Sequence, residues 1–237
     1  MKDADMLTDF PITKRWPAED PSKIQLYSLP TPNGIKVSAM LEETGLAYEP
    51  HLVNIMEDDQ FTPEFLSLNP NNKIPALIDP DGPGGQPLGL FETGAILIYL
   101  ADKTGLFLSQ NPAEKYETIQ WLMWQMGGVG PMFGQLGFFY AFGGKDIEDP
   151  RPRERYIGES KRLLGVLDKR LDGREFLMGD DYTIADIATW PWVRGLTSAY
   201  KADDVLELAT FENVLRWRAA CMARPASEKA VNIPGRP

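Results

Sequence analysis

The sequence predicts an α/β domain followed by an all-helical domain, and three observations carry this prediction. Between residues 24 and 105, short apolar runs typical of strands alternate with stretches of helical periodicity, in the order βαβ-α-ββ-α. Asn111-Pro112 interrupts the pattern, and beyond it only helical periodicity continues. A length of 237 residues suffices for two small domains. The expected parts are an N-terminal arm (1–22), the α/β domain (23–107), the helical domain (112–222) and a C-terminal tail (223–237).

Composition and charge limit the classes of partner. The chain is 43% hydrophobic and 24% charged, which is typical of a soluble globular protein. A net charge of −10 argues against nucleic acid or an anionic membrane as the main partner. The first residues do not resemble a signal peptide, and no apolar run approaches the ~20 residues of a membrane span. We therefore expect a cytoplasmic protein without membrane or nucleic-acid partners.

Cysteine and histidine are each present once. Because Cys221 is the one cysteine, no disulfide can form within the chain. His51 is the one histidine, which excludes a multi-histidine zinc site, so no metal is expected. We interpret His51 as an ordinary, partly exposed residue of a strand.

The α/β domain is expected to begin with a βαβ unit. Its strands cover residues 24–28 and 48–54, and its helix covers residues 33–44. Thr31 is a suitable N-cap, and Pro32 suits the first helical position. A unit of this kind has a right-handed crossover, so the two strands should be parallel.

The rest of this domain should add a short helix, an antiparallel pair of strands and a longer helix. Thr62 and Pro63 open the short helix as N-cap and first residue. A glycine-rich turn separates the two strands, which favours an antiparallel arrangement. The expected ranges are 76–79 and 88–91 for the strands and 93–105 for the helix.

In the helical domain, helices are expected over residues 113–126, 153–171 and 211–222. A further helix, apolar nearly all round, starts at the capping box Thr183-Ile184-Ala185-Asp186. Propensity predicts that the first of these helices fails at Gly127–Gly134, because Gly costs ~1 and Pro ~3 kcal/mol inside a helix. If the helix continues, it should kink near Pro131. The aromatic run 138–142 either lines a pocket or belongs to the core.

Both ends of the chain lack periodicity. Residues 1–22 form either an extended arm anchored by Trp16-Pro17 or a loose tail. Residues 227–237 are expected to lie on the surface.

The turn Thr31-Pro32-Asn33-Gly34 places a helix N-terminus directly after a strand. Such a terminus carries roughly half a positive charge and attracts an anion. Redox enzymes can place a low-pKa cysteine there, but this turn has no sulfur. If the site performs sulfur chemistry, the sulfur must arrive with the ligand.

Two further dipeptides stand where open α/β sheets bind ligands, at strand ends and helix starts. Ile74-Pro75 precedes a strand and is of the type that adopts the cis form in a tight turn. The backbone N–H and C=O of Ile74 could then pair with a peptide-like ligand, as in strand addition. Glu92-Thr93 opens a helix and offers a carboxylate, a hydroxyl and helix N–H groups, which suit the ammonium and carboxylate of an amino acid.

With these motifs in this order, residues 23–222 resemble the glutathione transferase superfamily. The stretches that carry the resemblance are Asn71-Asn72-Lys73-Ile74-Pro75, Phe91-Glu92-Thr93-Gly94-Ala95-Ile96 and the capping box. Within the superfamily, Thr31–Gly34, Gln60 and residues 72–75 resemble the Nu class, the bacterial type related to disulfide-bond reductases. The resemblance implies a thioredoxin-like N-terminal domain that binds glutathione, an all-helical C-terminal domain that shapes the second substrate site, and a homodimer.

The resemblance also implies a role for each matching residue. Ile74, before Pro75, would bind the cysteinyl backbone of glutathione, and Glu92 and Thr93 would hold its γ-glutamyl end. Lys73 and Gln60 would reach the glycyl carboxylate, and Thr31 and Asn33 would sit by the sulfur. The chain departs from the tyrosine- and cysteine-type members, because Tyr27 lies inside a strand and Cys221 lies far from the motif. A mixed disulfide on the enzyme is therefore not expected.

The implied activity is that of a glutathione-dependent enzyme. A free thiol has a pKa near 8.5, so little thiolate is present at pH 7. The helix N-terminus would favour the thiolate form of bound glutathione, and this thiolate would attack a disulfide. Disulfide-bond reduction is favoured, with weaker transferase or peroxidase activity. This preference uses the class resemblance and the glycine-rich stretch 127–137, which could leave room for two peptides. If Thr31 acts as the N-cap instead, Asn33 carries the sulfur contact.

Two alternatives remain open. One is a conjugating glutathione transferase. The other is a non-catalytic, glutathione-binding regulatory module, because members of the superfamily serve as domains of translation factors and nitrogen regulators.

Overall fold

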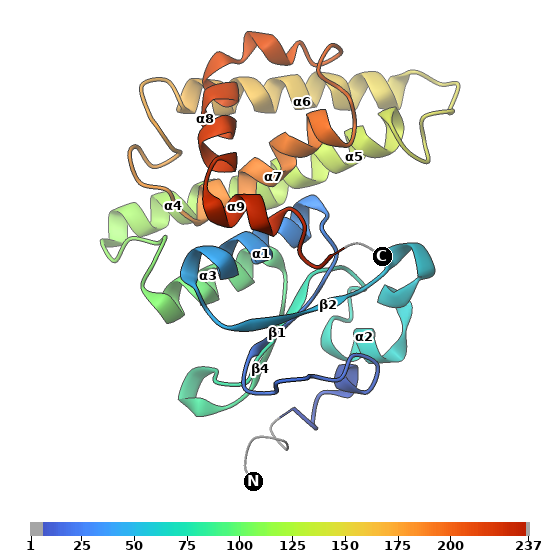
Figure 1. Ribbon diagram of the computed structural model, residues 1–237. Helices are drawn as coiled ribbons and strands as arrows, with labels where there is room; N and C mark the ends of the chain where they lie inside the picture. The colour runs from blue at the N-terminus through green and yellow to red at the C-terminus, as the bar shows by residue number, and fades with distance from the viewer. Residues whose placement is uncertain (1–6, 236–237) are drawn as a thin grey trace. The chain divides into compact units, whose positions relative to one another are not determined.

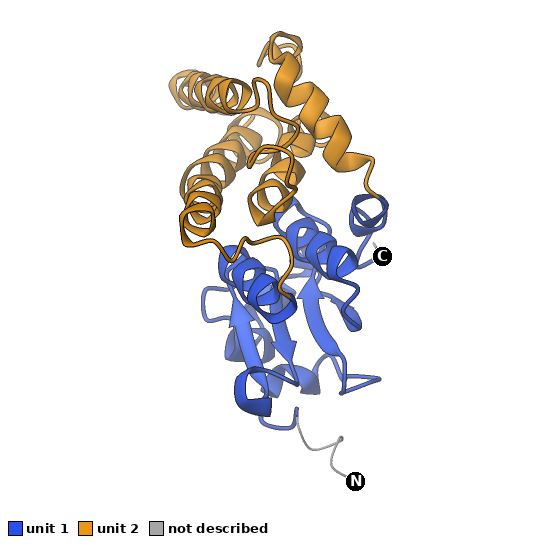
Figure 2. Ribbon diagram, turned by 90° about the vertical axis from the view of Figure 1, so that its left-hand side faces the viewer, with its two compact units in different colours: residues 1–104, 225–237 blue, residues 105–224 orange. Residues whose placement is uncertain are grey.

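The computed structural model describes residues 7–235, which form two compact units. Of the described residues, unit 1 comprises 7–104 and 225–235, and unit 2 comprises 105–224 (Figure 2). Unit 1 combines a sheet with helices and unit 2 is helical, which confirms the predicted fold class. Residues 1–6 of the expected arm and 236–237 of the expected tail lie outside the described residues.

The sheet of unit 1 has the strand order β2-β1-β3-β4. Its strands are β1 (Ile24–Ser28), β2 (Tyr48–Leu52), β3 (Ala76–Asp79) and β4 (Leu88–Phe91). As predicted, β1 is parallel to β2, and β3 is antiparallel to β4. The antiparallel pairing of β1 with β3 joins the two halves into a mixed sheet. The second strand ends at Leu52 rather than at the expected residue 54.

Helices cover both faces of this sheet (Figure 1). They are α1 (Pro32–Thr44), α2 (Pro63–Leu68) and α3 (Thr93–Thr104), and 3-10 turns occur at η1 (Pro11–Lys14), η2 (Ile55–Glu57), η3 (Asp59–Phe61) and η4 (Pro83–Gly85). Tyr27 and Ile78 pack in one core cluster with Phe65 of α2. Because side chains alternate along a strand, the buried Leu26 and Leu77 point to the other face, where α1 and α3 lie.

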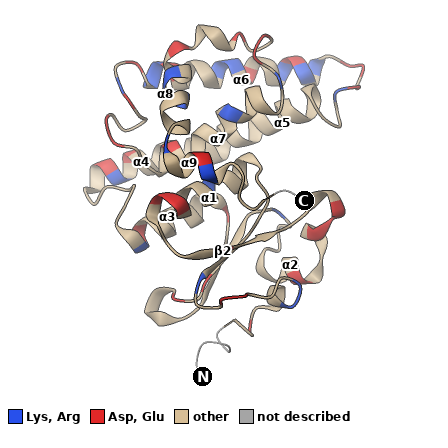
Figure 3. Ribbon diagram, viewed as in Figure 1, with Lys and Arg blue, Asp and Glu red and all other residues tan. Residues whose placement is uncertain are grey.

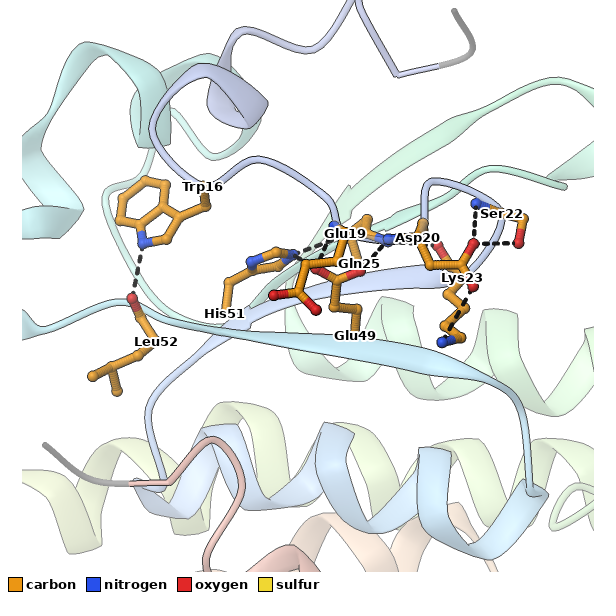
Figure 4. A network of polar contacts seen from close by, with 9 residues as sticks. All are labelled: Trp16, Glu19, Asp20, Ser22, Lys23, Gln25, Glu49, His51 and Leu52. Atoms are coloured by element: carbon orange, nitrogen blue, oxygen red, sulfur yellow. Dashed lines mark hydrogen bonds and ion pairs between the residues drawn. The ribbon is translucent and has the colours of Figure 1, made fainter. Parts of the chain in front are cut away.

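The N-terminal arm is anchored to unit 1 over the residues that the structure describes (Figure 4). Trp16 donates a hydrogen bond from Nε1 to the carbonyl oxygen of Leu52 at 2.9 Å. The backbone N–H groups of Glu19 and Asp20 donate to the carboxylate of Glu49 at 2.8 and 2.9 Å. The arm with Trp16 as its anchor is therefore the correct alternative for residues 7–22.

His51 is buried, so the expectation of a partly exposed residue is wrong. Its side chain is 8% exposed, and Nε2 lies 2.7 Å from Oε1 of Gln25. Parallel pairing places His51 beside Tyr27, and the two rings stack with centroids 4.8 Å apart. Burial lowers the pKa of His51, against the opposing charge of Glu49. The histidine therefore belongs to the interior of unit 1, where the arm network covers it.

Unit 2 contains α4 (Pro112–Trp124), a π-helical segment η5 (Gln125–Val129), α5 (Gly130–Tyr140), α6 (Arg151–Arg170), α7 (Ile184–Ser198), η6 (Leu208–Thr210) and α8 (Glu212–Met222). The charged residues of α6 recur along its length in Figure 3, whereas Leu163, Leu164 and Leu167 are buried. The amphipathic helix expected at 153–171 is thus confirmed with slightly earlier bounds.

The predicted failure of the helix at Gly127–Gly134 is wrong, because α4 continues through the π-helical segment η5 into α5. Packing explains this result. A Cβ on Gly137 would lie 2.5 Å from the ring of Tyr200, and one on Gly134 would lie 3.5 Å from Trp192. These glycines let α5 approach its neighbours closely, and the burial gained offsets their low helix propensity.

The capping box at the start of α7 is confirmed. Thr183 Oγ1 accepts a hydrogen bond from the N–H of Ala185 at 3.3 Å, and Asp186 Oδ2 accepts from the N–H of Thr183 at 3.0 Å. Asp186 Oδ1 also accepts from Nε1 of Trp217 at 2.9 Å. The cap therefore also joins α7 to α8 within unit 2.

The C-terminal segment folds differently from the expected surface tail. Residues Pro225–Ala230 form α9, which belongs to unit 1 and contacts α1. Ser227 and Ala230 are 1% and 0% exposed. Beyond the helix, Ser38 Oγ donates to the carbonyl oxygen of Ile233 at 3.1 Å. This docking was not predictable from local sequence patterns, because α9 is short and only weakly apolar.

Candidate active site

Three of the predicted site segments adjoin the sheet of unit 1 at the same edge. Ala76, the first residue of β3, pairs with Tyr27 of β1 and with Phe91, the last residue of β4. The turn after β1, the dipeptide before β3 and the dipeptide after β4 must therefore start from neighbouring positions. This edge also contains the end of β2, since Leu52 pairs with Ser28.

The turn after β1 carries Thr31 and Asn33. Thr31 is the N-cap of α1, and its Oγ1 accepts a hydrogen bond from the N–H of Gly34 at 3.3 Å. A Cβ on Gly34 would lie 1.9 Å from the carbonyl oxygen of Leu29, so only glycine lets the helix start so close to the strand. Asn33 is the second residue of α1. The sheet edge therefore carries a capped helix N-terminus, as predicted.

The dipeptide before β3 is Ile74-Pro75, and its peptide bond is cis, as predicted. The ladder of β3 begins only at Ala76. Lys73 precedes this step, and its carbonyl oxygen accepts from Nδ2 of Asn69 at 2.5 Å. Asn69 thus holds the loop that presents Lys73 and Ile74.

The dipeptide after β4 is Glu92-Thr93. Glu92 is exposed and has a φ of +70°, a conformation that residues other than glycine seldom adopt. Its carbonyl oxygen accepts from the N–H of Ile96 at 3.0 Å, so it stands at the start of α3. Thr93 is 4% exposed. A carboxylate and a hydroxyl therefore flank the first turn of this helix.

Gln60 lies on η3, beyond the end of β2. Its Oε1 is buried without a hydrogen-bond partner among the described residues. Buried polar atoms of this kind are generally paired, either with protein groups or with ordered water. Gln60 is held by its neighbour Asp59, which forms an ion pair with Arg15 and accepts from the N–H of Asn54 at 2.8 Å. The sheet register alone does not place Gln60 or Lys73 against the other site residues.

Lys36 is a residue of this site that the sequence analysis missed. It is 1% exposed, and its Nζ donates to Oγ1 of Thr93 at 3.2 Å. Burial lowers its pKa to about 7, while the charge of Glu92 opposes this shift. The sequence did contain a signal, because Lys36 stands four residues before Met40 and thus shares the buried face of α1.

The one cysteine of the chain lies elsewhere. Cys221 is in α8 of unit 2 and is 0% exposed. Sulfur chemistry at the edge of the sheet therefore depends on a thiol that comes with the ligand. Across residues 7–235, no three His, Cys, Asp or Glu side chains are grouped so that they could hold a metal ion. No helix in that range has both the length and the apolar character needed to cross a membrane.

A separate cavity of about 530 Å³ lies within unit 2. It contains none of the predicted site residues, and its lining includes Glu117, Arg170, Arg174 and Asp181. Arg170 is already bound to Glu117 at 2.6 Å and to the carbonyl oxygen of Leu177 at 2.8 Å. This cavity is therefore not the candidate active site.

The fold and the edge site together define a two-unit protein with a thioredoxin-like sheet unit and a helical unit. The family model of the glutathione S-transferase N-terminal domain matches residues 22–102, and that of the C-terminal domain matches residues 150–220. The chain belongs to the glutathione transferase family.

Among similar proteins is the disulfide-bond oxidoreductase YfcG of Escherichia coli (strain K12), which is 47% identical over 209 residues, covering 88% of this chain and 94% of YfcG. The disulfide-bond oxidoreductase YghU of the same organism is 44% identical, over 87% of this chain and 73% of YghU. A glutathione transferase from Burkholderia graminis, solved with two glutathione molecules bound per subunit, is 63% identical with a TM-score of 0.98, over 100% of this chain and 98% of that one. A glutathione transferase from Pseudomonas putida, solved with one glutathione disulfide bound per subunit, is 61% identical with a TM-score of 0.95. The match covers 97% of this chain and 99% of that one.

Proposed function

We propose that this protein binds glutathione at the sheet edge of unit 1 and uses its thiol to reduce disulfide bonds. The observation that carries this proposal is the convergence of a capped helix N-terminus, the Ile74-Pro75 step and Glu92-Thr93 at one edge, while Cys221 is buried elsewhere. Similarity to two disulfide-bond oxidoreductases supports the same activity.

The proposed roles follow the chemistry of each group. The backbone of Ile74, before Pro75, would pair with the cysteinyl unit. Glu92 would accept from the γ-glutamyl ammonium, and Thr93 would donate to the neighbouring carboxylate. Lys73 and the amide of Gln60 would bind the glycyl carboxylate. Oε1 of Gln60 has no hydrogen-bond partner among the described residues. Rotation of the side-chain amide by about 180° would place its NH2 group at this position, where it could donate to a ligand carboxylate, and this supports a ligand at that end.

At the sulfur, Asn33 and the first turn of α1 would favour the thiolate. The carboxamide of Asn33 has two N–H donors, whereas Thr31 has one hydroxyl donor and also caps the helix by accepting from Gly34, so we assign the main sulfur contact to Asn33. Hydrogen bonds to the anion and the positive end of the helix dipole both lower a thiol pKa from about 8.5. The glutathione thiolate attacks one sulfur of the substrate disulfide and forms a mixed disulfide, and the other sulfur leaves as a thiolate that takes up a proton. The thiolate of a second glutathione then attacks the glutathione sulfur of the mixed disulfide, which releases the second substrate thiol and forms glutathione disulfide.

Conjugation to an electrophile is the second candidate, and the glycine-rich stretch does not decide between the two. Gly134 and Gly137 serve close helix packing, so the idea that residues 127–137 leave room for two peptides loses most of its support. The relative with two bound glutathione molecules supports the disulfide reaction instead, because that reaction consumes two thiols.

Parallel turnover assays with glutathione test this proposal. We expect faster reduction of hydroxyethyl disulfide than conjugation of a chloronitrobenzene, with weaker activity on an organic peroxide. Dominant conjugation would reverse the order of the two enzyme proposals. Glutathione binding without turnover of any of these substrates would support the regulatory module.

We further propose that the protein is a cytoplasmic homodimer of the Nu class. The class assignment uses Thr31-Pro32-Asn33-Gly34, Gln60 and Asn72-Lys73-Ile74-Pro75, and similarity to YfcG and YghU supports it. Light scattering of the purified chain tests the dimer. Fractionation of cells that express it tests the cytoplasmic location.

A further inference from the structure

Lys36 places a buried cation behind the segment proposed to hold the γ-glutamyl end of glutathione. Its side chain is 1% exposed, and its Nζ lies 3.2 Å from Oγ1 of Thr93. Lysine is rarely buried so fully, because moving an ammonium group out of water is costly. A buried lysine in contact with a binding residue therefore indicates a function in that site.

The contact fixes the direction of hydrogen bonding at Thr93. An ammonium group can only donate, whereas a hydroxyl has one hydrogen and two lone pairs. Because Lys36 donates to Oγ1, the hydroxyl hydrogen of Thr93 points away from Lys36. The ammonium charge polarises the hydroxyl and strengthens it as a donor. Thr93 is thereby prepared for an anionic acceptor.

The neighbouring residue supplies the opposite charge. Glu92 is exposed and presents a carboxylate beside Thr93. Thr93 is the first residue of α3, where the helix dipole also favours an anion. A γ-glutamyl group carries an ammonium and a carboxylate on one carbon atom, so it needs an acceptor and a donor side by side. Glu92 and the pair Lys36–Thr93 provide this arrangement.

We propose that Lys36 is a positioning residue that makes Thr93 a selective donor to the α-carboxylate of γ-glutamyl thiols. This inference rests on the proposed binding of glutathione in unit 1. Lys36 acts through Thr93, since its own side chain is almost inaccessible. Asn33 lies one turn earlier on the same helix, so α1 orients both the sulfur contact and the γ-glutamyl contact.

Two glutathione analogues separate the charges of the γ-glutamyl group. 4-Aminobutyryl-Cys-Gly keeps the ammonium and lacks the α-carboxylate, whereas glutaryl-Cys-Gly keeps the carboxylate and lacks the ammonium. Calorimetry with both analogues and glutathione is carried out below pH 7, where Lys36 carries its charge, on the wild-type chain, Lys36→Met and the control Glu92→Gln. Thermal unfolding of each variant shows whether it is folded.

In the wild-type protein, loss of the α-carboxylate should weaken binding by about tenfold or more. In Lys36→Met, the preference for glutathione over 4-aminobutyryl-Cys-Gly should fall by about tenfold, with little change in the affinity for that analogue. Glu92→Gln should instead reduce the preference for glutathione over glutaryl-Cys-Gly. If Lys36 had a purely structural role, Lys36→Met would lower the affinity for all three ligands by the same factor. That result would overturn the inference.

Two outcomes separate this inference from the proposed function. A wild-type protein that binds no glutathione overturns both. A wild-type protein that binds glutathione and 4-aminobutyryl-Cys-Gly equally well overturns only the role of Lys36, whatever the variants do. If Lys36→Met does not fold, Lys36→Gln replaces it, because the amide keeps a donor and removes the charge, and the same loss of preference is expected.

Discussion

The hydroxyl oxygen of Thr31 lies 3.3 Å from the backbone nitrogen of Gly34, which makes Thr31 the N-cap of α1. Thr31 and Asn33 therefore contribute differently to the site. Thr31 stabilises the start of the helix, and Asn33 is the side chain that we propose as the main contact to the sulfur. The first prediction separates these contributions.

Thr31→Ala should lower the free energy of unfolding by about 1 kcal/mol, because one first-turn N–H loses its acceptor. It should leave most of the thiolate absorbance of bound glutathione intact. Asn33→Ala should show the opposite pattern, with near-normal stability and reduced thiolate absorbance. Ultraviolet difference spectra at pH 7 and urea titrations measure both effects. Wild-type thiolate levels in both variants would contradict the mechanism at the helix end.

Glu92 combines a proposed binding role with an unfavourable backbone conformation. At a φ of +70°, a residue with a Cβ is strained by about 1 kcal/mol relative to glycine. Glu92→Gly should therefore be more stable than Glu92→Ala by about that amount, while both lose affinity for glutathione. Lys201 has a φ of +54° in unit 2 and provides the control pair. Lys201→Gly should likewise be more stable than Lys201→Ala, but neither should change glutathione affinity.

The arm supports the loop that carries Gln60 through Asp59. Asp59 is 7% exposed and binds both Arg15 and the N–H of Asn54. Asp59→Asn should lower the free energy of unfolding by about 2 kcal/mol, because hydrogen bonds to a charged group are lost. It should also weaken glutathione binding, since Gln60 is the next residue.

The adjacent Asp58 is the matched control for this change. It is exposed and has a φ of +60°, which asparagine tolerates. Asp58→Asn should change the free energy of unfolding by less than about 0.5 kcal/mol. Equal effects of the two substitutions would show that the contact of the arm with Asp59 has no special role.

Lys36 should make stability depend on pH. Burial lowers its pKa in the folded protein to about 7, whereas the unfolded chain keeps the ordinary value of 10.5. Between these values the unfolded state binds more protons, so the free energy of unfolding contributed by this group rises with pH. The cost of the buried charge is complete below about pH 7 and is relieved as the pH approaches 10.5. Wild-type protein should thus gain stability relative to Lys36→Met over this range in urea titrations. A constant difference would contradict the burial of a charged lysine.

Local signals predicted the elements well, and long-range contacts explain what they missed. Helix starts are marked by signals that span only a few residues, so they could be predicted from the sequence. Examples are Thr31 with Pro32 and the capping box at Thr183. The contact of Lys36 with Thr93 joins two helices far apart in sequence, and no periodicity shows it. The continuation of α4 through η5 depends on neighbours such as Tyr200, which outweigh the propensity of glycine.

Helix α9 follows unit 2 in the sequence, yet it packs on α1 in unit 1. Unit 1 therefore cannot be completed on the ribosome until the whole of unit 2 has been translated. A truncation after residue 224 would uncover the side of α1 that contacts α9 and would remove one of the two acceptors of Ser38. Replacing residues 225–235 with a fusion partner or an affinity tag should accordingly destabilise unit 1.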